Sequence, residues 1–560
     1  MKFKHLLFFG WLFLLWFFLF PGCQKSETPT PSEDQPNFSF EISFSPEVHS
    51  QPITGRVYII LSQNKKKEPR FQVSPTGVPF FGKNIHSLEP GKGAVVDESV
   101  FGYPVESIRK LPKGTYYLQG FINLYTRFDR SDGHTVWLPK DHWEGQKWNR
   151  SPGNLYSSVR KVHIDPSKNK KIQLVCDQKI PPVEIPEDPK WVKRIKFQSE
   201  ILTEFWGQPM YLGATVLLPK GYEKHPEVRY PVNYIQGHFS LRNPYGFTLE
   251  KPEKKDRRAQ RRYKFSQYWL SEDCPRMIAV TLQHPCPYYD DSYAVNSENV
   301  GPYRDAIMKE LIPKIEEQFR IIQKPYARIL SGGSTGGWIS FALQVFHPDF
   351  FGGTFSLCPD PLDFRAFQIV NIYKDSNAYY KKHDWFQVER PCCRLPDGSI
   401  RFSMEDENHY EMVIGDKSRS GGQWDIWEAA FGPVGKNGYP QRLWDKKTGK
   451  INPKVAQYMK EHYDLRYYLE KNWTQLGPKL KGKLHVYTGT MDSYYLNNGV
   501  HFMEEFLEKT KNPYYEGTIE YGKRKPHCWG PRGQELIQLI AQQVTQNAPP
   551  PEETKSWKYK

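Results

Sequence analysis

A serine flanked by glycines is the clearest sign of chemistry in this sequence. The run Gly332-Gly333-Ser334-Thr335-Gly336-Gly337 contains the pattern G-x-S-x-G, with a strand-like apolar run at 327–330 before it and a helical pattern at 338–346 after it. Glycines permit a sharp turn from strand to helix, so Ser334 would project at a helix N-terminus. A purely structural glycine turn is the alternative. We predict that Ser334 is a nucleophile and that the backbone N–H of Thr335 is one oxyanion donor.

An acid and a histidine follow Ser334 in the chain order that a triad on an α/β sheet requires. The predicted strand 484–487 leads into a loop with Asp492, and the predicted last strand 518–521 leads into a loop with His527. His527 would take the Ser334 proton and return it to the leaving group, while Asp492 orients the imidazole. These three residues are the predicted catalytic triad.

Other candidate acids and ligands are weaker. Asp360 and Asp363 follow the predicted strand 354–358, which comes one place too early for the orienting acid. The eight cysteines show neither a disulfide framework nor the spacing of a zinc site. We therefore expect neither a metal nor a cofactor.

Two regions with different patterns must position these residues. Within 38–178, apolar residues recur at every second position between turn clusters, which predicts an all-β sandwich domain. The proline-rich stretch 179–190 is typical of a semi-rigid extended linker.

From 191 to 548, short apolar strands alternate with helices. Apolar residues recur every four positions within 303–319, which predicts a helix, and 533–544 is the predicted last helix. This alternation predicts the α/β class, with a mostly parallel sheet covered on both faces, and leaves 549–560 as a tail. The predicted strands are 216–218, 232–235, 277–282, 327–330, 354–358, 484–487 and 518–521.

The first 22 residues have the pattern of a secretory signal peptide. A positive region at 1–4 precedes the apolar run 6–20, which is too short to favour a membrane span. Cys23, at the start of a polar tether over 23–37, resembles the lipid-bearing residue of a bacterial lipoprotein. We expect an exported protein anchored by its lipid to the membrane of the cell envelope, with free secretion as the alternative.

The net charge of +15 is spread along the sequence. Basic runs such as 65–67 and 257–262 lie in polar contexts that are typical of solvated loops. With the export signal, this argues against a nucleic-acid partner, whereas attraction to anionic lipid or polysaccharide stays open.

Two further motifs accompany the serine turn: Tyr230-Pro231-Val232-Asn233-Tyr234-Ile235-Gln236-Gly237-His238 and Ile312-Pro313-Lys314-Ile315-Glu316. With them, 192–545 resembles the putative esterase family of α/β-hydrolases, which includes feruloyl esterases, enterochelin esterases, S-formylglutathione hydrolases and mycolyltransferases. The resemblance implies an α/β-hydrolase fold and a second oxyanion donor, the backbone N–H of His238. The family's triad falls on Ser334, Asp492 and His527.

The sequence departs from the family pattern in two places. Gln236-Gly237-His238 replaces the commoner His-Gly order, which leaves the second donor open within 237–239. About 360–480 is a long insertion where a crossover of a dozen or so residues is usual. We predict that it forms a lid over the active site, with a structural elaboration elsewhere as the alternative.

Two other stretches are candidates for substrate contact. The loop 290–302 follows a strand at its carboxyl end, where ligands bind in open α/β sheets, and its aspartates and amides suit a sugar better than a cation. A polar loop without a ligand is the favoured interpretation, with the sugar contact as the alternative. Trp137, Trp143 and Trp148 could stack on a sugar or, as we expect, pack against the catalytic half.

These features together predict a serine carboxylic-ester hydrolase that acts through an acyl-serine intermediate on a carbohydrate ester or another extracellular small molecule. An acyltransferase with the same triad is one alternative, because a site that excludes water lets another hydroxyl intercept the intermediate. A non-catalytic cell-surface binding lipoprotein is the other, since fold alone does not establish function.

Overall fold

The computed structural model describes residues 38–168, 170–253 and 255–549, which belong to one unit of mutual contacts. The predicted signal peptide, the lipid-bearing Cys23, its tether and nearly all of the predicted tail lie outside the described residues. No helix in the described ranges is long and apolar enough to cross a bilayer.

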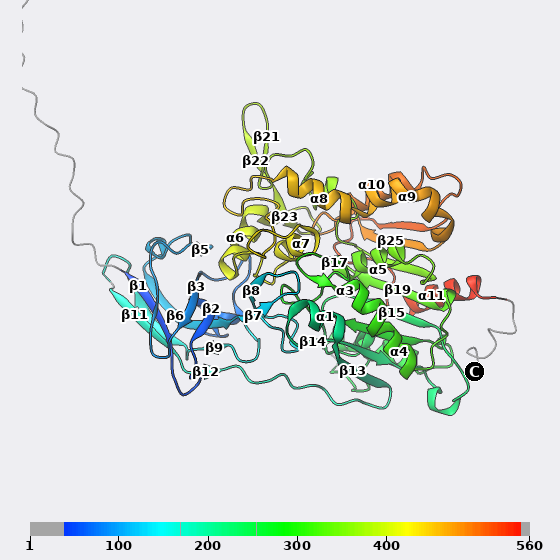
Figure 1. Ribbon diagram of the computed structural model, residues 1–560, viewed down its shortest axis with the longest axis horizontal. Coiled ribbons are helices and arrows are strands. Elements are labelled where there is room, and N and C mark those ends of the chain that lie inside the picture. Colours follow the sequence, from blue (N-terminus) through cyan, green and yellow to red (C-terminus); the bar gives the residue numbers. More distant parts are fainter. Residues whose placement is uncertain (1–37, 169, 254, 550–560) are drawn as a thin grey trace, which may run out of the picture. The chain divides into compact units, whose positions relative to one another are not determined.

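The N-terminal region consists of two facing β-sheets (Figure 1). Side chains from both sheets, including Phe40, Val57 and Leu174, meet in one core, because alternate side chains of a strand point to the same face. The predicted β-sandwich is confirmed. One sheet contains β11 (Lys171–Cys176), β1 (Ser39–Phe44) and β4 (Ala94–Val96). The other contains β12 (Gln178–Lys179), β9 (Leu155–Tyr156), β6 (Gly114–Leu124), β2 (Ile53–Ser62), β3 (Phe80–Leu88) and β5 (Gly102–Tyr103), with β10 (Arg160–Ile164) paired to β6.

The C-terminal region is built on an eight-stranded sheet. Its order is β13 (Val192–Ser199), β14 (Met210–Leu217), β16 (Ile278–Gln283), β15 (Val232–Gln236), β19 (Arg328–Gly333), β20 (Gly353–Leu357), β25 (Leu484–Gly489) and β26 (Thr518–Gly522). β14 runs antiparallel to both neighbours, and every pair from β16 to β26 is parallel. This sheet confirms the predicted α/β-hydrolase fold class. All the predicted strands lie in it, and the prediction missed β13, in which Lys and Arg interrupt the apolar pattern.

Helices pack against this sheet, and their positions match the three predicted helical stretches, 303–319, 338–346 and 533–544. The stretch predicted as one helix over 303–319 is helical but contains a π turn at Ile307–Leu311. Pro313 cannot donate the bond that an α-helix would direct to the carbonyl of Lys309, and the wider turn accommodates this loss. The helices are α1 (Glu200–Trp206), α2 (Arg257–Trp269), α3 (Tyr303–Ala306), α4 (Ile312–Gln318), α5 (Thr335–Phe346), α10 (Asn497–Leu507) and α11 (Gln534–Asn547).

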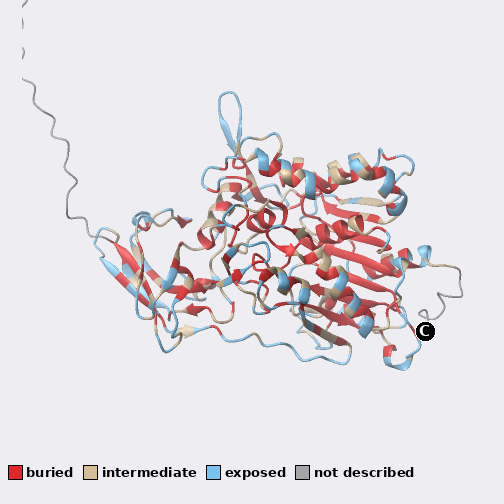
Figure 2. Cartoon of the chain, in the orientation of Figure 1, coloured by how far each residue is buried: buried red, intermediate tan, exposed pale blue. Residues whose placement is uncertain are grey.

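The insertion between β20 and β25 has its own helices and hairpins. Helix α7 (Gln423–Phe431) is buried from Trp424 onward, whereas the hairpin of β21 (Tyr380–Lys382) and β22 (Gln387–Glu389) projects into solvent (Figure 2). The other elements are β23 (Pro391–Arg394), β24 (Ile400–Ser403), α6 (Met404–Ile414), α8 (Pro453–Tyr463) and α9 (Leu465–Leu480).

The N-terminal region contributes directly to the packing of the C-terminal region. The hairpin of β7 (Thr126–Asp129) and β8 (Thr135–Leu138) inserts Phe128 and Val136 into the core around the large sheet. From β2, Arg56 Nε donates to the carbonyl of Val413 at 2.9 Å. The β-sandwich is therefore held against both the sheet and the insertion.

Candidate active site

Ser334 occupies a strained turn between β19 and α5. Its φ of 59° and ψ of −125° lie in a region that non-glycine residues rarely adopt. The Ser334 N–H donates to the carbonyl of Leu357 in β20 at 2.9 Å, which holds the turn against the neighbouring strand. The turn leaves Ser334 partly exposed at the carboxyl edge of the sheet, as expected of a nucleophile elbow.

The structure brings Ser334, His527 and Asp492 together in series. His527 Nδ1 lies 2.7 Å from Asp492 Oδ2, and His527 Nε2 lies 2.9 Å from Ser334 Oγ. Because a carboxylate can only accept, Nδ1 is the donor and Nε2 is left to accept the serine proton. This is the arrangement that a serine nucleophile and its base require.

Asp492 is fixed in place from several directions. Its side chain is fully buried, and Oδ1 accepts the backbone N–H groups of Tyr494 and Leu496 at 2.9 and 3.3 Å. Arg394, in the insertion, donates from Nε to the Asp492 carbonyl at 2.9 Å. These contacts hold the carboxylate in one orientation, with Oδ2 directed at His527.

The imidazole of His527 has an unusual acid–base environment. Burial lowers its pKa, but hydrogen bonds to Asp492 and Cys528 and the charges of both outweigh burial and raise the pKa of His527 to about 10. A raised pKa favours the protonated imidazole, and only the neutral imidazole can accept the Ser334 proton. Asp492 makes the larger contribution to the rise, and Cys528 adds a second one.

The two predicted oxyanion donors belong to segments that meet at the elbow. A Cβ added to Gly336 would lie 2.1 Å from the carbonyl oxygen of Gln236, so the turn that carries His238 is packed directly on the start of α5. Among the described residues, no hydrogen bond engages the N–H of Thr335 or of His238. Both groups are free to bind a developing negative charge.

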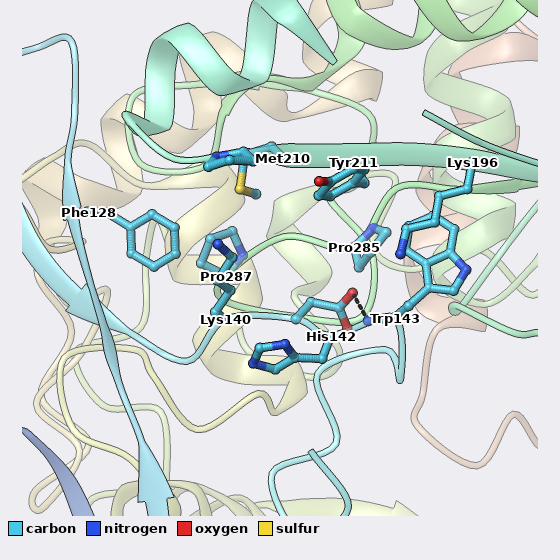
Figure 3. A pocket seen from close by; sticks show the side chains of 11 residues that line it. Phe128, Lys140, His142, Trp143, Lys196, Met210, Tyr211, Pro285 and Pro287 are labelled. Carbon is cyan, nitrogen blue, oxygen red and sulfur yellow. Dashed lines mark hydrogen bonds between the residues drawn. The ribbon is translucent and has the colours of Figure 1, made fainter. Parts of the chain in front are cut away.

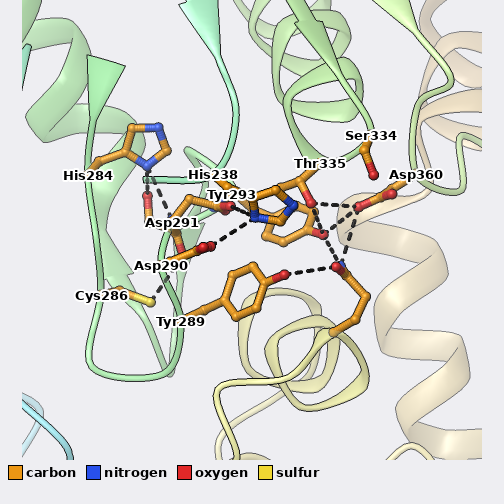
Figure 4. A network of polar contacts seen from close by, with 12 residues as sticks. His238, His284, Cys286, Tyr289, Asp290, Asp291, Tyr293, Ser334, Thr335 and Asp360 are labelled. Atoms are coloured by element: carbon orange, nitrogen blue, oxygen red, sulfur yellow. Dashed lines mark hydrogen bonds and ion pairs between the residues drawn. The ribbon is translucent and has the colours of Figure 1, made fainter. Parts of the chain in front are cut away.

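The His238 side chain has an ionic partner that the sequence did not suggest (Figure 4). Its Nδ1 lies 3.0 Å from Asp290 Oδ1 and 3.6 Å from Asp291 Oδ2. Burial opposes the positive charge, but the hydrogen bond to Asp290 and the charges of both carboxylates raise the pKa of His238 to about 9. Both aspartates are buried and lie against protein groups, whereas the sugar contact considered for this loop stays an untested alternative.

A second polar network joins the loop, the elbow and the insertion (Figure 4). The hydroxyl of Tyr293 donates to Asp360 Oδ2, and Thr335 Oγ1 also donates to that oxygen at 3.2 Å. From α7, Trp427 Nε1 donates to the Tyr293 hydroxyl at 2.7 Å. Asp360 therefore braces the elbow, and no hydrogen bond joins it to His527 among the described residues. The insertion forms a wall beside the site, and its action as a lid stays a prediction.

The tryptophans of the N-terminal region are mostly structural. Trp143 is buried against Phe239, with ring centroids 5.1 Å apart, and borders a cavity of about 190 Å³ beside β13 and β14 (Figure 3). The carbonyl of Trp137 accepts a hydrogen bond from Arg419 of the insertion, whereas Trp148 packs on Tyr58 within its own sandwich. The expected packing against the C-terminal region thus holds for Trp143, whereas Trp137 contacts that region through its backbone.

A larger cavity, of about 890 Å³, borders the elbow between α2 and the sheet. Gly332 and Gly333 before Ser334, and Pro531 after His527, contribute to its wall. One acid, Asp273, also lines it. Its floor is apolar, with Ile235, Tyr245, Phe265 and Leu357. Its rim carries Arg258, Arg261, Arg262, Lys264 and Arg532, none of which forms an ion pair within the described residues.

Part of the chain is similar to known proteins. Residues 210–412 match the family model described as "Esterase: Putative esterase". No curated protein matches the chain. A solved ferulic acid esterase is 13% identical over 63% of this chain and 96% of its own, with a TM-score of 0.34. The fluorophosphonate-binding serine hydrolase F of Staphylococcus aureus is 14% identical over 63% and 98%, with a TM-score of 0.33. An S-formylglutathione hydrolase from Agrobacterium tumefaciens is 12% identical over 63% and 92%, with a TM-score of 0.31. The segment that carries Ser334 and both candidate oxyanion donors is thus similar to the putative esterase family.

Proposed function

We propose that this protein is a serine carboxylic-ester hydrolase. The observation that carries the proposal is the series Asp492, His527 and Ser334, with contacts of 2.7 and 2.9 Å, at a strained strand-to-helix turn. Similarity of 210–412 to the putative esterase family supports the same reaction class.

In the proposed reaction, Ser334 Oγ attacks the ester carbonyl carbon while its proton passes to His527 Nε2. The carbonyl oxygen becomes an oxyanion between the N–H groups of Thr335 and His238. The protonated His527 then gives its proton to the leaving alcohol, which leaves an acyl group on Ser334. Water, deprotonated by His527, releases the acid and restores the enzyme.

The substrate we propose is a carbohydrate ester or another extracellular small molecule that carries a negative charge. The cavity of about 890 Å³ beside the elbow has the size of a small-molecule site. Its apolar floor suits an apolar part of the ligand, and its rim of five cations against one acid favours a carboxylate or a similar anion.

Steady-state hydrolysis of p-nitrophenyl esters of graded acyl length tests this proposal. The expected result is release of p-nitrophenol that is lost in Ser334→Ala. Acyl transfer, the alternative, requires product formation that depends on an added sugar or lipid alcohol. Glycan binding that survives Ser334→Ala in a protein that hydrolyses no ester would instead favour a binding lipoprotein.

We also propose that the protein is exported and carries a lipid on Cys23. The basis is the positive region, apolar run and cysteine of residues 1–23. Metabolic labelling with palmitate in a bacterial host should mark the wild-type protein and fail to mark Cys23→Ala, and equal labelling of both would contradict the proposal.

A further inference from the structure

Two cysteines far apart in the chain meet beside His527. The Sγ atoms of Cys358 and Cys528 lie 2.6 Å apart, although 170 positions separate the residues. A disulfide bond is about 2.05 Å long, and unbonded sulfur atoms do not pack as closely as this pair does. Both thiols are free in this structure. The backbone thus already holds the two sulfurs close to bonding distance.

Cys358 lies next to the segment that holds Ser334, and Cys528 lies next to His527. Cys358 directly follows Leu357, whose carbonyl holds the Ser334 N–H, and Cys528 directly follows His527. Both cysteines have positive φ, 41° for Cys358 and 60° for Cys528, which non-glycine residues rarely adopt. Two residues with left-handed backbone conformations, distant in sequence but close in space, thus direct their sulfur atoms toward one another.

The two thiols differ in accessibility and acidity. Cys358 is fully buried, whereas Cys528 is partly exposed. The hydrogen bond from Cys358 and the neighbouring His527 outweigh burial and lower the pKa of Cys528 to about 5. Thiolates are the nucleophiles of thiol–disulfide exchange, so Cys528 is the sulfur that an external disulfide meets first.

We propose that Cys358 and Cys528 form a disulfide that fastens the loop of His527 to the end of β20. The Cys528 thiolate attacks one sulfur of an external disulfide, such as that of an oxidised thiol–disulfide oxidoreductase, and releases one thiol. Cys358 then loses its proton and attacks Cys528 Sγ, which breaks the mixed disulfide and releases the second thiol. Two protein thiols are oxidised, and one external disulfide is reduced to two thiols.

The bond has a consequence for the base, and this part rests on the proposed function. The charged and titratable groups around His527 are Asp492, Cys528, Cys358, Asp360 and, with ring centroids 5.1 Å apart, Tyr494. In the dithiol form, the Cys528 thiolate helps to raise the pKa of His527 to about 10. The disulfide has no thiolate, so the contribution of Cys528 is lost and the pKa of His527 falls, while Asp492 continues to raise it. Oxidation therefore lets His527 act as a base at a lower pH than in the dithiol form.

Peptide mapping of the exported wild-type protein, purified without reductant, tests the bond itself. The protein is unfolded, alkylated with iodoacetamide and digested, with and without prior reduction by dithiothreitol. We expect one cross-linked peptide pair containing Cys358 and Cys528, which becomes alkylated only after reduction. Cys274 and Cys286 should be alkylated in both samples. Alkylation of both Cys358 and Cys528 without reduction, even after native protein is equilibrated with oxidised glutathione, would overturn the proposal.

The pH dependence of kcat/KM for one ester, in oxidised and reduced protein, tests the consequence. A base acts only when deprotonated, so activity rises with pH through the pKa of His527, and we expect this rise at lower pH in the oxidised protein. Cys358→Ser should lose this response to dithiothreitol, whereas the control Cys274→Ser should keep it. A rise at the same pH in both forms contradicts the effect on His527. If the peptides are cross-linked but the protein hydrolyses no ester, the disulfide is supported and the proposed function is rejected.

Discussion

The Nζ of Lys147, in the N-terminal region, lies 2.7 Å from Asp290 Oδ2, and the other oxygen of the same carboxylate pairs with His238. Asp290 is buried, so this carboxylate is balanced by one cation from each region of the chain. Because the backbone of His238 is a candidate oxyanion donor, we expect Lys147 to help position the site, although the N-terminal region contains none of Ser334, Asp492 and His527.

Lys147→Met should therefore weaken catalysis without touching the triad. Lys147 is half exposed, and pairs of this kind are worth about 0.5–1 kcal/mol, so kcat/KM should fall about two- to fivefold. Steady-state kinetics measure this. Lys147→Arg, which keeps the charge, is the matched control and should restore most of the activity. Wild-type kcat/KM in Lys147→Met would show that the β-sandwich does not position His238.

The triad residues should act as one unit. Ser334→Ala, His527→Ala and the double variant should fall to a similar residual rate, because removing one member already disables the others. Asp492→Asn should lower kcat by about 10³–10⁴-fold, since it fixes the wrong tautomer of the imidazole.

Asp360→Asn is the matched control for Asp492→Asn. The amide keeps an oxygen that can accept from Tyr293 and Thr335, and no hydrogen bond joins Asp360 to His527 among the described residues. The fall in kcat in Asp360→Asn should therefore be far smaller than the fall in Asp492→Asn. Equal losses in the two variants would make Asp360 a second orienting acid and contradict the assignment of Asp492.

Gly336→Ala should damage the oxyanion site. The new Cβ would lie 2.1 Å from the Gln236 carbonyl and 2.8 Å from the Gly237 nitrogen, which are backbone atoms that must move. We expect kcat to fall by about 10²-fold or more, as when an oxyanion donor is lost. KM should change little. Gly333→Ala is the control, because its Cβ meets nothing closer than 3.5 Å. A Gly336→Ala enzyme with wild-type kcat would place the oxyanion elsewhere.

Charge at the rim of the large cavity should select among esters. Arg532→Glu should raise KM several-fold for an ester with a free carboxylate and leave kcat unchanged. The methyl ester of that carboxylate is the control, since it has no charge to lose. The difference should shrink as ionic strength rises, because salt screens exposed charges. Equal KM changes for both substrates would exclude the rim from substrate binding.

The sequence predicted the parts of this molecule that depend on local pattern. Buried parallel strands are short and apolar, and Ser334, Asp492 and His527 each follow one of them, so the fold class and the triad candidates could be identified. For the insertion at about 360–480 and for the segment with Trp137, Trp143 and Trp148, the sequence showed an unusual length or composition but not the contacts they make.

The contacts that shape the site could not be predicted in this way. Lys147 and Asp290 are 143 positions apart, and Cys358 and Cys528 are 170 apart. Neither pair leaves a local pattern, because each depends on how loops from different elements pack. The ion pair between His238 and Asp290 could not be predicted either, because the position of His238 suggested only a role for its backbone N–H.

Tandem mass spectrometry that locates a fluorophosphonate adduct, formed on intact, folded protein, tests whether Ser334 is the activated nucleophile. We expect one adduct, on the peptide containing Ser334, that is lost in Ser334→Ala and in His527→Ala although both variants keep the wild-type circular dichroism spectrum. Adduct formation at another residue, or no adduct in folded wild-type protein, would contradict this expectation.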